Sequence, residues 1–205
     1  MVYLIAGLII GFFVALPIGA AAILCINRTL QFGLKPGLFT GLGVALADLL
    51  YGMFAVFGLF AISGDTLQNQ PVLRLAGSLC IMFIGLRMMS KVPESLEGQE
   101  ISHETALKDT ITGFLVTISN PMTIIAFVAA LSYVNFLMEE INFISSVLIV
   151  TGIFIGSLAW WSILSYLSLL FKDKLTGNIL RKFNIGSGFL IFAFGVLLII
   201  SINNF

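Results

Sequence analysis

Charged residues are scarce in this sequence, and their scarcity excludes most soluble folds. Only 10% of the 205 residues are charged, whereas a soluble domain carries about 25%. Hydrophobic residues make up 59% of the chain. The longest polar interval, about residues 91–109, is too short to build a core of its own. The composition therefore predicts an integral membrane protein with a single transmembrane domain over residues 1–205.

Cysteine and histidine are also rare, which argues against several kinds of chemistry. Cys25 and Cys80 lie in apolar segments without C-x-x-C spacing, so neither a disulfide framework nor a disulfide-shuttling electron carrier is favoured. The single histidine, His103, lies in an acidic loop, and no H-E-x-x-H run suggests an intramembrane hydrolase. We expect no enzyme activity, no cofactor, no metal site and no nucleic-acid partner.

Long apolar segments dominate the rest of the chain. A membrane-spanning helix needs about 20 mostly apolar residues. Six segments reach this length, at roughly residues 2–26, 37–62, 71–90, 110–137, 141–171 and 184–202. All Lys and Arg residues except Arg74 lie in or beside the first, third and fifth loops. The positive-inside rule then predicts that these loops are cytoplasmic and that both termini are extracytoplasmic.

Similarities between segments indicate a duplicated three-helix unit. Residues 11–17 resemble residues 113–121, with two extra residues before the second proline, and the third and sixth segments match at an offset near 110. Because three is odd, the two halves would enter the membrane from opposite sides, as in many secondary transporters. We predict an all-α fold of two inverted repeats, about 1–90 and 110–205. A chance echo of glycine-rich segments is the alternative.

Two prolines interrupt the first and fourth segments at comparable places. A proline inside a helix removes a hydrogen bond and clashes with the carbonyl four residues earlier. We therefore predict breaks at Pro17-Ile18-Gly19 and at Ser119-Asn120-Pro121. Paired interruptions in a membrane protein point to a binding site, although a packing kink is the simpler alternative.

Asp48 is the only acid that we place in the middle of an apolar segment. Leaving an acid at bilayer depth costs about 2.5–3.5 kcal/mol, so it is read as functional, with a structural hydrogen bond to a neighbouring helix as the alternative. When the halves are aligned, Ser157 falls near Asp48, so the second half has no matching acid. Tyr51 extends the face of Asp48, and Thr117 shares a face with Asn120, which makes these residues candidates for a polar lining.

Small residues recur at every fourth position in the first two segments. The rows are Gly7, Gly11, Ala15 and Gly19, and then Gly33, Gly37, Gly41 and Ala45. Such rows let helix backbones approach closely, and Asp48 continues the second row. We therefore expect Asp48 to face a neighbouring helix. The rows also allow a homodimer, unless they are used up within one subunit.

Four stretches together resemble the LysE family (LysE/RhtB-type) of amino-acid exporters: Ala15–Leu30, Gly41–Gly52, Gly85-Leu86-Arg87 and Ser119–Thr123. The resemblance implies a carrier of the bacterial inner membrane that exports amino acids or related small metabolites, driven by protons. It maps the embedded acid of the family onto Asp48 and its proline motifs onto Pro17, Gly19, Asn120 and Pro121. Ala20 replaces a proline that the family usually has, which suggests a gentler first break.

These observations lead to a mechanistic hypothesis. Asp48 would bind either the cationic amine of the substrate or a proton, which gives an antiport cycle. The backbone N–H groups at the two breaks would bind the substrate carboxylate, as helix N-termini do. A metal-ion or other cation exporter on the same scaffold is the alternative function, although a single acid makes a poor site for a divalent metal.

Overall fold

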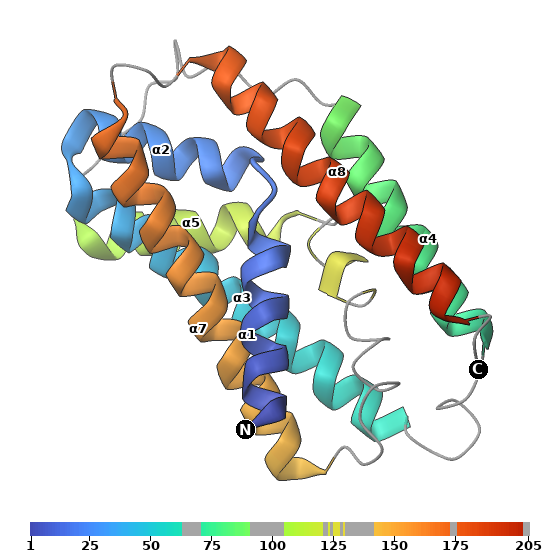
Figure 1. Ribbon diagram of the computed structural model, residues 1–205. Helices are drawn as coiled ribbons and strands as arrows, with labels where there is room; N and C mark the ends of the chain where they lie inside the picture. The colour runs from blue at the N-terminus through green and yellow to red at the C-terminus, as the bar shows by residue number, and fades with distance from the viewer. Residues whose placement is uncertain are drawn as a thin grey trace.

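The computed structural model describes residues 1–62, 71–90, 105–120, 123, 125–127, 129, 142–172 and 176–202, which form helices and no strand (Figure 1). The bounds of the longer helices are as follows: α1 Val2–Ala15, α2 Ala20–Phe32, α3 Leu34–Ile62, α4 Pro71–Ser90, α5 Ala106–Ile118, α7 Phe143–Leu170 and α8 Gly177–Ile202.

Three of these helices, α3, α7 and α8, are long and apolar enough to cross a membrane, and the bent pair α1 and α2 makes a fourth candidate. They confirm a membrane protein whose regular structure, over the described residues, is entirely α-helical. The third predicted segment forms α4, whose shorter apolar part runs over residues 75–90. The arrangement of six spans in two inverted repeats stays a prediction, because most of residues 121–141 lie outside the described ranges.

The first predicted segment is broken where its proline predicted. Helix α1 ends at Ala15, Gly19 caps α2 in an extended conformation, and the two helices meet at 80°. The break is therefore sharp although Ala20 stands where a second proline was expected. Figure 1 shows that α2 and α5 both run across the direction of α1. Helix α5 ends at Ile118, directly before the second predicted break.

Glycines bring α1 and α7 into backbone contact. A Cβ atom at Gly7 or Gly11 would collide with the backbone of Ile149 or Ile153. In return, a Cβ atom at Gly152 would collide with the backbone of α1. The predicted first row of small residues is thus confirmed for Gly7, Gly11 and Ala15, all of which are buried. Gly19, in contrast, has nothing within 4 Å of a built Cβ atom.

Helices α3 and α5 cross in the same way. Gly43 packs against the backbone of Thr110 and Phe114, and Gly113 packs against the backbone of Thr40. Gly113 therefore takes the position in this crossing that Gly7 takes in the first one. The sequence comparison had paired Gly113 with Gly11, which lies about one helical turn after Gly7. Gly7 and Gly11 of the first row also pack inside one subunit, so they are not available for the dimer contact that the rows allowed.

The second row of small residues is confirmed only in part. Gly33 lies outside the helix face, because it ends α2 with a φ of 96°, a conformation that favours glycine. Gly37 packs against Thr29 and Ser165, and Gly41 packs against Trp161. This part of the row seats α3 against α2 and α7.

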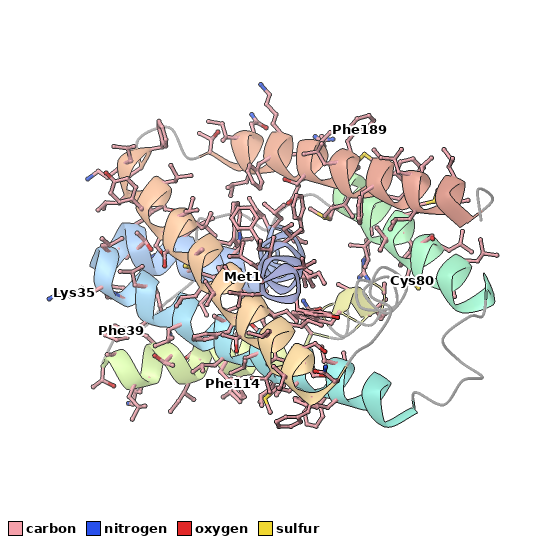
Figure 2. All side chains as sticks on the ribbon, turned by 60° about the horizontal axis from the view of Figure 1, so that its bottom comes forward. Met1, Lys35, Phe39, Cys80, Phe114 and Phe189 are labelled. Atoms are coloured by element: carbon pink, nitrogen blue, oxygen red, sulfur yellow. The ribbon has the colours of Figure 1, made fainter. Side chains whose placement is uncertain are left out.

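Helices α4 and α8 form a pair beside this bundle (Figure 1). Gly85 and Gly188 approach each other's backbone, and Gly195 packs against Met82. The outer faces carry large apolar side chains, such as Phe189, which points away from the bundle in Figure 2 and is 61% exposed. Apolar outer faces of this kind are what a surrounding lipid bilayer requires.

Candidate functional site

Asp48 lies in the middle of α3 and faces α7, as the row of small residues predicted. Its side chain is only 2% exposed. The hydroxyl of Ser157 donates a hydrogen bond to Asp48 Oδ2 at 2.6 Å, and Trp161 Nε1 donates to the same hydroxyl at 3.1 Å. The Asp48 carboxylate is therefore hydrogen-bonded to a neutral donor and shielded from solvent by α7, and we call this the closed arrangement.

The hydrogen-bond partner of Asp48 is Ser157, the residue that falls near Asp48 when the two halves of the sequence are aligned. Ser157 follows Gly156 on the face of α7 that packs against α1 and α3. Trp161 follows one helical turn later, so a single face of α7 presents both donors. The α3 row seats against this face, with Gly41 on Trp161 and Gly52 on Ile153. Close packing of small residues thus brings Asp48 to within hydrogen-bond distance of α7.

At the first helix break, the backbone groups of Ile18 are hydrogen-bonded by a residue that the sequence analysis missed. Asn184 of α8 accepts a hydrogen bond from the Ile18 N–H at 3.0 Å and donates one to the Ile18 carbonyl at 3.1 Å. Asn184 is buried, whereas Pro17 and Gly19 beside it are half-buried. The signal available in the sequence was an amide at the start of an otherwise apolar segment. The N–H of Ile18, which we expected to bind substrate, is engaged here.

The second break is satisfied partly from α3. The Tyr51 hydroxyl donates to the Ile118 carbonyl at 2.5 Å, at the end of α5. Proline has no N–H, so Pro121 cannot donate a hydrogen bond to the Thr117 carbonyl. This carbonyl accepts a hydrogen bond from the Asn120 N–H at 2.9 Å. The Thr117 hydroxyl donates to the Gly113 carbonyl within its own helix.

The predicted site residues therefore fall into separate groups. Asp48 and Tyr51 are one turn apart on α3, and Tyr51 contacts the end of α5. The Asn120 side chain is exposed, and Pro121 lies outside the described residues. Trp160 stacks on Phe183, next to Asn184, with ring centroids 5.7 Å apart, so α7 lies close to the first break as well.

A buried ion pair is the second finding that the sequence analysis missed. Arg28 of α2 and Asp109 of α5 are 4% and 0% exposed, and Arg28 Nε lies 3.3 Å from Asp109 Oδ1. Arg28 Nη1 also donates to the Asp109 carbonyl at 3.1 Å and to Thr40 Oγ1 at 3.0 Å. Asp109 is thus a second buried acid, in the other half of the chain, although it lies in the first turn of α5 and not in the middle of a long apolar segment as Asp48 does.

The sequence did not reveal this ion pair because hydropathy is a local measure. Arg28 and Asp109 lie at the polar ends of their segments, so hydropathy assigned them to loops. Tertiary packing of the short helices α2 and α5 buries them. Asp109 lies in the first turn of α5, where the helix dipole favours an acid, and Thr105 caps this helix.

Among the described residues, no three side chains of His, Cys, Asp or Glu come close enough to hold a metal ion together. Both cysteines are free, with Cys25 buried in α2. The polar groups found here are single acids, hydroxyls, amides and one ion pair.

Comparison with known proteins assigns the sequence to a family. Residues 12–202 match the family described as LysE type translocator. The chain is 24% identical to the "Putative amino acid efflux protein YcgF" of Bacillus subtilis, over 92% of this chain and 90% of the relative. It is 29% identical to the "Uncharacterized membrane protein YahN" of Escherichia coli, over 80% of this chain and 73% of the relative. No solved structure matches the chain.

Proposed function

Because the chain belongs to the LysE type translocator family, and is thus a membrane transporter and not an enzyme, we propose that it exports amino acids or related small metabolites by proton antiport. The name of the Bacillus relative supports amino acids as the substrate class. We place the carrier in the bacterial inner membrane, with loops one, three and five in the cytoplasm and both termini outside.

Asp48 is the observation that carries this proposal. It lies at the centre of a helix long enough to span the membrane, and it is almost completely buried. Among the described residues its hydrogen-bond partner is the neutral Ser157, and no Lys or Arg forms an ion pair with it. A buried acid without a cationic partner is costly, and this cost is justified if a proton and a cationic amine bind there in turn.

The transport cycle requires the closed arrangement around Asp48 to open. Asp48 is shielded by its contact with α7, so α3 and α7 separate, or α1 and α2 move, when substrate enters. The break at Pro17 and Gly19 provides a joint for such a movement, because helix hydrogen bonding is interrupted there. A substrate carboxylate would then compete with Asn184 for the Ile18 N–H.

A vesicle assay tests the substrate class. Purified protein is reconstituted in liposomes with a pH gradient, and counterflow of the twenty common amino acids is measured against protein-free liposomes. Loading parallel vesicles with cadmium and other divalent cations tests the alternative of a cation exporter on the same scaffold. Transport of cations without transport of any amino acid would contradict the proposal.

Asp48→Asn then tests the role of the acid. The amide keeps the shape and accepts the Ser157 hydrogen bond, but it cannot exchange a proton. We expect proton-driven uptake to be lost, while exchange of unlabelled for labelled amino acid without a pH gradient is retained in part. Asp48→Glu serves as the matched control because it keeps an acid. If Asp48→Asn leaves proton-driven uptake unchanged, Asp48 is not the coupling acid.

A further inference from the structure

The buried pair of Arg28 and Asp109 has no role in the cycle described above. It joins α2 to α5, and the contact with Thr40 adds α3. Thr40 lies eight residues before Asp48 on the same helix, which corresponds to about 12 Å along the helix axis. A second charged site therefore lies roughly two turns of α3 away from the embedded acid.

Stability alone does not account for this pair. Removing two charges from water is expensive, and apolar residues of similar size often replace a buried ion pair with no loss of stability. The Arg28 and Asp109 side chains are nearly or fully buried, so this cost applies to both.

The position of the pair links it to the two helix breaks. Helix α2 directly follows the first break, and α5 directly precedes the second. Movement at either break would therefore move α2 or α5 and draw the two charges apart. Once separated, each charge needs a new partner, because an unpaired buried charge is strongly unfavourable.

An amino acid supplies both partners in one molecule. Its carboxylate matches the forked guanidinium of Arg28, which can donate two parallel hydrogen bonds, and its ammonium group matches the Asp109 carboxylate. We propose that Arg28 and Asp109 form a second binding site for zwitterionic amino acids, which the two residues close by pairing with each other when no substrate is bound. This inference rests on the proposed function and narrows the substrate class to molecules carrying both charges.

The double variant Arg28→Met/Asp109→Leu separates binding from structure. It removes both charges and leaves no lone buried ion, so a purely structural pair predicts a folded protein with normal kinetics. The proposal predicts a folded protein whose KM for the amino acid best transported in the vesicle screen rises by about tenfold or more. An unchanged KM in the folded double variant would overturn the proposal.

A conservative single variant covers the case in which the double variant does not fold. Arg28→Lys keeps the charge but loses the forked donor pair. We expect its KM to rise for the amino acid but not for the corresponding amine, made by removing the carboxylate. Equal changes for both compounds would contradict carboxylate binding by Arg28. If the wild-type protein transports no amino acid, the proposed function fails as well, whereas a failure confined to these variants leaves it standing.

Discussion

Replacing Asn184 by leucine tests whether a single amide holds the first helix break together. Asn184 makes two hydrogen bonds to the backbone of Ile18, one through each end of its carboxamide. Leucine has a similar size, so the variant removes both bonds and leaves little empty space. The Ile18 N–H and carbonyl would then be buried without these partners, at a position where the proline has already interrupted the helix.

The expected loss of stability follows from the number of groups left unsatisfied. Each buried backbone group that loses its partner costs about 1–3 kcal/mol. Hydrogen bonds inside membrane proteins have a smaller average value, near 0.6 kcal/mol, because the unfolded helices also find partners. Two lost bonds give about 1 kcal/mol by the membrane average and about 2–6 kcal/mol by the cost of unsatisfied groups, so we expect Asn184→Leu to lower the free energy of unfolding by about 1–4 kcal/mol.

The assay is unfolding in mixed micelles of mild detergent and dodecyl sulfate, followed by tryptophan fluorescence. Trp160 stacks on Phe183, directly beside Asn184, so its emission reports on this part of the protein. Asn178→Leu is the matched control, because Asn178 lies exposed on the same helix. If the two variants unfold within about 0.5 kcal/mol of each other, the clamp at Ile18 is not a stabilising contact.

Two further substitutions test the packing around Asp48. Ser157→Ala removes the hydroxyl that orients the Asp48 carboxylate, and we expect proton-driven uptake to fall by about tenfold, whereas Ser162→Ala, whose hydroxyl bonds within its own helix, should leave it unchanged. Gly43→Ala forces a methyl group into the backbone of α5 and should destabilise the protein by about 2 kcal/mol or more in the same unfolding assay. Gly186→Ala, with nothing within 4 Å of the new Cβ atom, should not destabilise it; equal effects at the two glycines would refute the close crossing of α3 and α5.

The crossings of α1 with α7 and of α3 with α5 bear on the proposed duplication. In both, a glycine of the long helix packs between two backbone segments of the short one: Gly152 against residues 4–8, and Gly43 against residues 110–114. Asp48 and Ser157, aligned between the halves, contact each other. Contact between equivalent residues is expected near a two-fold axis, which supports the prediction of inverted repeats.

The sequence by itself determined the class of the protein and the places where its helices break. Scarcity of charge and long apolar segments require a lipid environment, and a proline inside a helix, beyond the first turn, removes a backbone hydrogen bond, so these features depend on local composition. The row of small residues also determined the face of Asp48, because helix geometry repeats along the chain.

Only the tertiary structure decided which side chains hydrogen-bond the backbone at the helix breaks and which charged residues pair with each other. Ile18 and Asn184 are 166 residues apart, and Arg28 and Asp109 are 81 residues apart, so no local pattern relates them. The 80° bend after α1 and the placement of α5 bury two charges that lie at polar ends of their segments. Burial depends on what packs around a residue, and for Arg28 and Asp109 that environment includes helices distant in the chain, α5 for Arg28 and α2 and α3 for Asp109.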